Sequence, residues 1–156
     1  MKMSILTATF NRAYCLKKLY QSLVENSNYE VELEWLIMDN GSTDDTKELI
    51  ESFLKEARLN IKYFYQENQG KMVAINNLVP LVQGDLIIEV DSDDYLTNTA
   101  VKIIKNRYYL LEKNPDIYAF AFLRYNQELC NIGSTFKNDN YISTMFDLYF
   151  KDRNHW

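Results

Sequence analysis

The stretch Leu86-Ile87-Ile88-Glu89-Val90-Asp91-Ser92-Asp93-Asp94 decides how this chain is interpreted. Its first five residues are mainly apolar, which predicts a buried strand, and three carboxylates follow within four positions. Carboxylates this close raise one another's pKa unless a cation lies between them. A divalent metal with oxygen ligands is the simplest such cation. The stretch therefore predicts a strand that ends in a metal site, suited to a ligand that carries phosphate.

Strand and helix patterns alternate on both sides of this stretch. Short apolar runs predict strands over residues 3–9, 31–38, 61–65, 86–90 and 117–125. Apolar residues at helical spacing predict helices over residues 16–24, 71–82 and 100–111, and a further helix that Ser42 or Thr43 caps. Such alternation predicts an α/β fold, a three-layer α/β/α arrangement around a mostly parallel, Rossmann-like sheet.

Polar residues follow three of the predicted strands, at residues 9–12, 39–43 and 91–94. Ligands of parallel α/β sheets bind beyond the carboxyl ends of the strands, near the point where the strand order reverses. We therefore expect the three polar clusters to converge on one pocket.

The composition limits the classes of partner. A net charge of -5 over 156 residues argues against a nucleic-acid binder, although it leaves a nucleotide ligand open. Cys15 and Cys130 do not form a CxxC pair, so we expect free thiols in a reducing compartment. Neither a signal-peptide pattern nor an apolar run of about 20 residues is present. We expect no transmembrane segment and a cytoplasmic location, with peripheral membrane attachment and homo-oligomers left open.

Four motifs in this order resemble the family 2 glycosyltransferases. They are Thr7-Ala8-Thr9-Phe10-Asn11-Arg12, Met38-Asp39-Asn40-Gly41-Ser42-Thr43-Asp44, Glu67-Asn68-Gln69-Gly70-Lys71, and residues 84–94. The resemblance implies the nucleotide-diphospho-sugar transferase fold of GT-A type. It also implies an inverting, metal-dependent transfer of a sugar from a nucleotide-diphospho-sugar, expected to be UDP-linked, to a hydroxyl acceptor such as a glycan. The expected setting is bacterial polysaccharide or cell-surface glycan synthesis.

The resemblance also implies how the chain is organised. It runs from residue 3 to about residue 96 and says little after residue 125. We expect a nucleotide-sugar-binding α/β domain at residues 1–125. Residues 126–156 are expected to be a partial acceptor-side segment of a truncated chain.

By resemblance, Asp91 and Asp93 form a DxD motif that binds Mn²⁺ or Mg²⁺. Asp93 is the expected direct ligand, whereas Asp91 contacts the metal, its water shell or the ribose. Asp94 would orient the loop or the sugar. The alternative is that the carboxylates cap the following helix. An EF-hand is excluded because Leu96 stands where that loop requires glycine.

The resemblance assigns the nucleoside to residues at the first two strand ends. Thr9 and Phe10 would cradle the base, with Phe10 stacking on it or, alternatively, belonging to the core. Asn11 or Arg12 would hold the loop or reach a phosphate.

The second strand end and the helix that starts at Lys71 complete the expected site. Asp39 and Asn40 stand where the family usually has two aspartates, and the Asn40 amide oxygen can accept a hydrogen bond from the base N3–H. A plain Asn-Gly turn is the alternative for this pair. Lys71 opens a predicted helix, where it either meets an anion or is a solvated surface lysine.

No catalytic base can be assigned between residues 97 and 156, so a non-catalytic nucleotide-sugar-binding fragment is the alternative function. A dinucleotide-dependent enzyme would need a glycine-rich turn after the first strand, and none is present. A phosphoacceptor domain would need an acidic pair where this chain has Asn11 and Arg12.

Overall fold

The computed structural model describes residues 1–27 and 29–114, together with 116, 119, 124–126, 128 and 130–132. The chain divides into two compact units, Met1–Asn106 and Arg107–Trp156. The boundary expected after residue 125 lies inside the second unit. The acceptor-side role expected for residues 126–156 stays a prediction, because residues 133–156 lie outside the described part of the chain.

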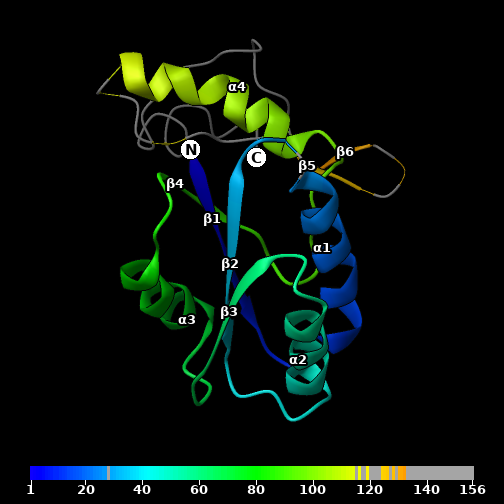
Figure 1. The fold of residues 1–156 in the computed structure, drawn as a ribbon. Coiled ribbons are helices and arrows are strands. Elements are labelled where there is room, and N and C mark those ends of the chain that lie inside the picture. Colours follow the sequence, from blue (N-terminus) through cyan, green and yellow to red (C-terminus); the bar gives the residue numbers. More distant parts are fainter. Residues whose placement is uncertain are drawn as a thin grey trace. The chain divides into compact units, whose positions relative to one another are not determined.

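The first unit contains a parallel sheet with the strand order β3-β2-β1-β4 (Figure 1). Its strands are β1 (Lys2–Thr9), β2 (Glu32–Asp39), β3 (Asn60–Tyr65) and β4 (Leu86–Glu89). The chain passes outward from β1 through β2 to β3 and then crosses to the other side of β1 for β4. The strand order therefore reverses between β1 and β4. The parallel sheet expected from the alternating pattern is confirmed.

Helices cover both faces of this sheet. Helices α1 (Ala13–Asn26) and α2 (Thr46–Glu56) lie on one face, and α3 (Lys71–Leu78) lies on the other (Figure 1). Helix α4 (Ala100–Lys113) begins in the first unit, where Val101 and Ile104 pack with Met3 and Leu33. The expected three-layer α/β/α arrangement is confirmed.

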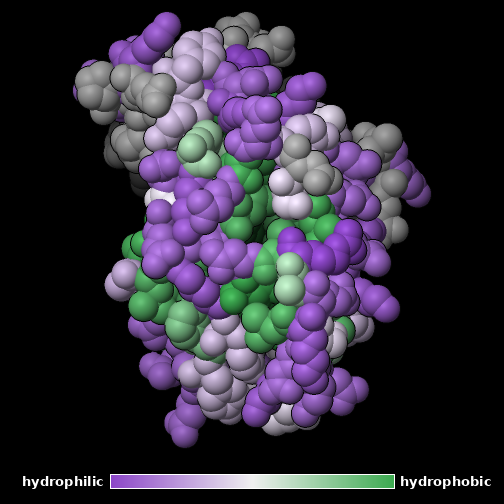
Figure 2. Space-filling view, viewed as in Figure 1, coloured by the Kyte–Doolittle hydropathy of each residue, from purple (hydrophilic) through white to green (hydrophobic). Residues whose placement is uncertain are grey.

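Strand β2 lies in the middle of these layers and is buried on both faces. Trp35 and Ile37 pack with residues of α1 and α2, whereas Leu36 and Met38 pack with α3. Because neither face meets water, the strand is a nearly continuous apolar run rather than an alternating one. Figure 2 shows apolar residues gathered in the middle of the view between polar residues of the surface.

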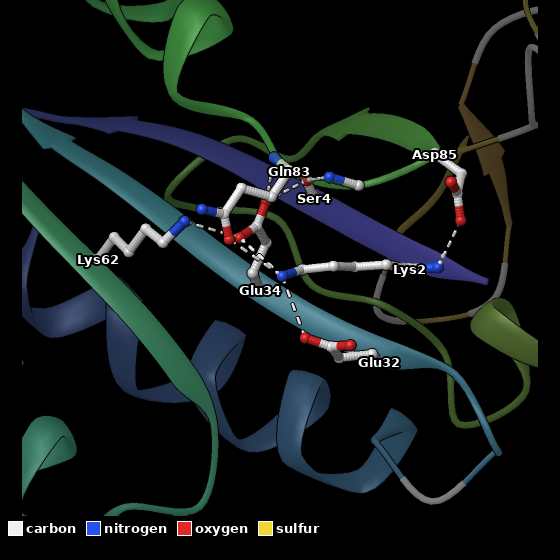
Figure 3. A network of polar contacts seen from close by, with 8 residues as sticks. Lys2, Ser4, Glu32, Glu34, Lys62, Gln83 and Asp85 are labelled. Atoms are coloured by element: carbon white, nitrogen blue, oxygen red, sulfur yellow. Dashed lines mark hydrogen bonds and ion pairs between the residues drawn. The ribbon is translucent and has the colours of Figure 1, made fainter.

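Glu34 interrupts the apolar run of β2, and its charged side chain is 0% exposed. Its carboxylate accepts hydrogen bonds from Ser4 Oγ at 2.5 Å, Gln83 N at 2.7 Å and Lys62 Nζ at 2.9 Å. Lys2 Nζ lies 3.4 Å away, and Figure 3 shows these groups converging on Glu34. Burial raises the pKa of Glu34, but the hydrogen bonds outweigh it and lower this pKa to about 2.

The start of α2 differs from the sequence prediction. The helix begins at Thr46, and the carboxylate of Asp44 accepts hydrogen bonds from its N–H at 3.2 Å and its hydroxyl at 2.5 Å. Ser42 and Thr43 contact the loop that follows β1 instead. The predicted cap is therefore wrong, because both residues are engaged in a tertiary contact.

Helix α3 ends shortly before a proline. The helix stops at Leu78, and a 3₁₀ turn, Val79–Leu81, replaces the last turns of the predicted helix. Pro80 lies in this turn, and proline cannot supply the N–H that an α-helix would need there.

Two short strands of the second unit are described. They are β5 (Arg124–Tyr125) and β6 (Asn131–Ile132), and they pair antiparallel in a separate sheet. The strand expected over residues 117–125 is described only at residues 119, 124 and 125. The remainder of that expected strand lies outside the described residues.

Candidate functional site

A pocket of about 410 Å³ opens at the carboxyl ends of β1, β2 and β4. It lies where the strand order reverses, which is the usual ligand position in sheets of this kind. The pocket is lined by Ala8, Thr9, Phe10, Arg12, Asn40, Asn68, Gly70, Lys71, Asp91, Ser92 and Asp93. The three strand ends that the sequence analysis singled out thus meet at one pocket.

The register of the sheet explains this convergence. Thr9 on β1 pairs with Asp39 on β2, and Asp39 pairs with Tyr65 on β3, so these three strands end level with one another. Strand β4 ends beside Leu6, and the chain then continues toward the same edge through Val90 to Asp91.

Lys71 connects α3 to the acidic end of β4. Its Nζ lies 2.5 Å from Asp91 Oδ1 and 2.8 Å from Glu89 Oε1. The hydrogen bond to Asp91, followed by the one to Glu89, raises the pKa of Lys71. Lys71 is therefore more than a solvated lysine on the helix surface, because it supplies positive charge directly to Asp91.

Arg12 supplies a second cation to the same loop. Its Nη1 lies 2.5 Å from Asp93 Oδ2, and this hydrogen bond raises the pKa of Arg12. The counter-charge that the sequence analysis sought for these carboxylates is thus supplied, in the described part of the chain, by Arg12 and Lys71.

The donor set still fits a divalent metal. The described residues contain no group of three or more His, Cys, Asp or Glu side chains placed to hold a metal. Asp91 and Asp93 nevertheless line one pocket and offer oxygen ligands. Mg²⁺ is usually held in this way, by one or two carboxylates together with substrate phosphates and water.

The structure contradicts two alternative interpretations of the residues around this pocket. The helix-cap interpretation of the carboxylates is wrong, because α4 begins only at Ala100 and the Ala100 N–H donates to the Thr97 carbonyl. The core interpretation of Phe10 is also wrong, because its side chain lines the pocket and is 44% exposed. Asp94 is not among the pocket-lining residues, and its N–H closes a turn onto the Asp91 carbonyl.

Thr9 carries an unsatisfied polar group at this pocket. The residue is only 2% exposed, and its Oγ1 has no hydrogen-bond partner among the residues that the structure describes. Buried hydroxyls are normally paired with protein or water, so this unpaired hydroxyl is an exception on a residue that lines the pocket.

Asn40 lines the pocket, and its amide is already occupied by the loop that precedes α3. Its Oδ1 accepts from Gln66 Nε2 at 2.8 Å and from Gln69 N at 3.1 Å. Its Nδ2 donates to Asn68 Oδ1 at 2.9 Å. A carbonyl oxygen has two lone pairs, so both acceptor positions are taken. The base contact expected of Asn40 stays a prediction, and it would require one of these bonds to open.

Gly41, in the loop after β2, packs closely against Asn68 in the loop before α3. It has φ of 91°, and an added Cβ would lie 3.0 Å from Asn68 N. Both the positive φ and the close approach favour glycine at this position.

Asp39 and Asn11 do not line the pocket. Asp39 is buried and accepts from Ser42 N and from the Tyr63 hydroxyl, both at 2.8 Å. Asn11 has φ of 51°, and its Oδ1 accepts from Thr43 N at 2.7 Å. Both residues therefore hold the loops that shape the pocket.

Sequence analysis missed some residues that the structure places at the site. Asn68 belongs to a motif that was quoted, but no role was assigned to it, and Gly70 was considered only for its backbone at the start of the helix. Glu89 pairs with Lys71, and its signal was a charged residue within the apolar run of β4.

The strand order and the polar pocket at its switch point define a parallel α/β protein with the ligand position usual for such sheets. Comparison with known proteins is more specific. The family model described as glycosyl transferase family 2 matches residues 4–154, so the chain belongs to this family.

Individual proteins agree with the family assignment. An uncharacterized glycosyltransferase of Mycoplasma pneumoniae is 34% identical over 128 residues, which cover 80% of this chain and 42% of that protein. The GalNAc(5)-diNAcBac-PP-undecaprenol beta-1,3-glucosyltransferase of Campylobacter jejuni is 32% identical over 123 residues, which cover 78% of this chain and 37% of that protein. The chain thus spans less than half the length of these relatives.

A solved structure confirms the fold. Staphylococcus aureus TarS, residues 1–349 in complex with UDP-GlcNAc, matches with a TM-score of 0.62 and 26% identity. The match covers 72% of this chain and 32% of that chain. The fold is therefore the nucleotide-diphospho-sugar transferase fold of GT-A type. In the described part of the chain, no helix combines the length and apolar character needed to cross a membrane.

Proposed function

We propose that this chain carries the donor half of an inverting, metal-dependent glycosyltransferase. The donor is a nucleotide-diphospho-sugar, and the acceptor is a hydroxyl group of a glycan or another molecule. The observation that carries the proposal is the pocket at the β1–β4 switch point, where Asp91 and Asp93 face Lys71 and Arg12. Carboxylates suit a metal and cations suit phosphates, so a metal–diphosphate complex would find partners for both of its parts.

Thr9 and Phe10 would form the nucleoside end of the site. The partly exposed ring of Phe10 offers a face on which a base can stack. The unpaired Thr9 hydroxyl offers a hydrogen bond to the nucleoside. The similarity to TarS, whose structure contains UDP-GlcNAc, supports UDP as the nucleotide to test first.

Asp91, Asp93, Lys71 and Arg12 would form the diphosphate end. Asp93 would hold Mn²⁺ or Mg²⁺, with Asp91 as a second ligand or a partner of the metal's water. When bound, the metal would neutralise the charge that develops on the departing nucleoside diphosphate. Lys71 and Arg12 would donate hydrogen bonds to phosphate oxygens.

Asp39, Asn40, Asn11 and Asp94 would mainly position these groups. Asp39 and Asn11 fasten the loops after β1 and β2, and Asn40 fastens the loop before α3. The backbone of Asp94 closes the turn that presents Asp91 and Asp93, and its side chain is proposed to orient the sugar.

The reaction itself would be a single displacement. The acceptor hydroxyl attacks the anomeric carbon as the diphosphate departs, and a general base must take the hydroxyl proton. We assign that base to none of the described residues. Binding of the nucleotide sugar without transfer is therefore the second candidate function.

We place the reaction in cell-surface glycan or polysaccharide synthesis on the cytoplasmic side. The lipid-linked substrate in the name of the Campylobacter relative supports this setting. The free thiols of Cys15 and Cys130 fit a reducing compartment.

Calorimetry with UDP in the presence and absence of Mn²⁺ tests the binding proposal. We expect UDP to bind with Mn²⁺ and to bind much more weakly after EDTA is added. Absence of binding by UDP, GDP and dTDP with either metal would overturn the proposal. Turnover of UDP-sugars with added acceptor hydroxyls then distinguishes a transferase from a module that only binds.

A further inference from the structure

The two carboxylates that the proposed function gives to a metal each pair with a side-chain cation. Lys71 contacts Asp91, and Arg12 contacts Asp93, both at 2.5 Å. Lys71 is the first residue of α3 and Arg12 is the N-cap of α1. Both cations therefore stand at helix starts that the fold holds beside the pocket.

These ion pairs would compete with a metal that binds to the two carboxylates without a diphosphate. A divalent ion on the same carboxylate oxygens would displace Lys71 and Arg12 and would then repel them at short range. The displaced Arg12 would also lose its contact with Asp93, and Lys71 would keep Glu89 but lose Asp91. A diphosphate removes this conflict, because its oxygens can accept hydrogen bonds from both cations.

Glu89 gives Lys71 a second anchor. Its carboxylate lies 2.8 Å from Lys71 Nζ, and its side chain projects from β4 on the partly exposed side of the sheet edge. If Asp91 turns to a metal, Glu89 can keep Lys71 at the mouth of the pocket. Glu89 is thus a positioning residue for the lysine.

Thr9 indicates independently that this pocket takes a ligand. Thr9 lines the pocket and its hydroxyl is buried without a hydrogen-bond partner among the described residues, whereas the Asp91 and Asp93 carboxylates that line the same pocket are paired. A cluster whose only role was to link loops would leave this hydroxyl unexplained.

We propose that Lys71 and Arg12 are internal counter-ions that make metal binding depend on the diphosphate. In the free protein they hold Asp91 and Asp93. In the complex the carboxylates pass to the metal and the two cations pass to the phosphates. The proposal rests on the proposed function, and it requires that metal and nucleotide strengthen each other's binding by the same factor.

The variant Lys71→Met distinguishes a counter-ion of Asp91 from a residue that only contacts phosphate, because only a counter-ion affects Mn²⁺ binding when no nucleotide is present. The free Mn²⁺ signal in electron paramagnetic resonance measures metal affinity without any enzymatic activity. Without nucleotide, we expect the variant to bind Mn²⁺ about three- to fivefold more tightly, because an exposed ion pair no longer competes. With Mn²⁺ present, we expect UDP to bind roughly tenfold more weakly, because a charged donor to phosphate is lost.

Lys105→Met is the matched control. It removes the same charge and the ion pair of Lys105 with Glu30, and neither residue lines the pocket. Both affinities should remain at the wild-type values. Lys71 is about half-exposed, so neither variant should change the unfolding midpoint measurably.

The outcomes separate this inference from the proposed function. Equal Mn²⁺ affinity of the wild-type and Lys71→Met proteins without nucleotide would overturn the counter-ion role. Independent binding of UDP and Mn²⁺ to the wild-type protein would overturn it as well. If no nucleotide binds, the proposed function fails, whereas the Mn²⁺ comparison still decides whether Lys71 competes with the metal.

Discussion

Glu34 lies on β2 and Asp91 in the loop after β4, and both carboxylates pair with a lysine, but their surroundings differ. The Glu34 side chain is 0% exposed and accepts hydrogen bonds from Ser4, Lys62 and the Gln83 backbone. The Asp91 side chain is 38% exposed, and its partner Lys71 is 49% exposed.

This difference separates charged groups that stabilise the fold from charged groups that can bind a ligand. A buried carboxylate is costly unless all its partners are in place, so the Glu34 network is tied to folding. Exposed ion pairs add little to stability, and their members can change partners at low cost. The Asp91 and Asp93 pairs are therefore suited to exchange with a ligand.

Low pH should destabilise the folded protein through the Glu34 network, and this is the largest effect that we expect. The Glu34 pKa is about 2 in the folded protein, against an ordinary value of 4.5. Because the folded-state pKa is the lower one, the stabilisation is fully present above pH 4.5 and is lost as the pH falls toward 2. We expect the free energy of unfolding to lose about 3 kcal/mol from this group.

Urea unfolding between pH 5 and pH 2.5 measures this loss. Glu34→Gln cannot titrate, so the difference in stability between wild type and variant should shrink as the pH falls. A difference that stays constant through this range would contradict the assignment.

Asp93→Ala should weaken ligand binding strongly and change stability little, which is the reverse of the effect expected at Glu34. We expect the affinity for UDP with Mn²⁺ to fall roughly a hundredfold, because a metal ligand is lost. The free energy of unfolding should change by less than about 0.5 kcal/mol, since the side chain is half-exposed. Calorimetry and urea unfolding of one preparation check both. A large loss of stability with unchanged UDP affinity would reverse the roles assigned to the two clusters.

Gly84→Ala tests the packing around Ser4, the partner of Glu34. An added Cβ would lie 2.5 Å from Ser4 Oγ and 2.8 Å from Ser4 N, so the backbone of β1 or of the chain before β4 must move. We expect a loss of about 2 kcal/mol in the free energy of unfolding. UDP affinity should stay near wild type, because Gly84 does not line the pocket. Wild-type stability of this variant would show that the two segments separate easily.

Thr9→Val should give the smallest effect. Removing a hydroxyl that has no protein partner should leave stability unchanged or raise it by up to about 1 kcal/mol. The affinity for UDP should fall about three- to fivefold. Ser4→Ala is the contrasting variant, because its hydroxyl donates to Glu34, and it should lower stability without changing affinity. Unchanged UDP affinity in Thr9→Val would remove Thr9 from the site.

The layers and the position of the pocket were predictable from the sequence. The apolar runs that become β1, β2 and β4 end in polar clusters, and parallel strands bring such ends to one edge. Local periodicity is sufficient for this inference because it depends only on which residues face the core.

The partners within the site were not predictable in the same way. Arg12 meets Asp93 across 81 positions of sequence, and Lys71 meets Asp91 across 20. The resemblance assigned Asn40 to the base, and a single sequence does not show that Gln66 and Gln69 already donate to its oxygen. Such pairings depend on how separate loops pack, and local pattern carries little information about them.

The three hydrogen bonds of the Asn40 side chain have an entropic consequence. Its bonds to Gln66, Asn68 and Gln69 order one wall of the pocket before any ligand is present. Conformational freedom in that loop is lost when the chain folds, so binding need not order it again. Replacing Asn40 by alanine should therefore weaken a nucleotide mainly through a less favourable entropy of binding, even where the ligand never touches residue 40.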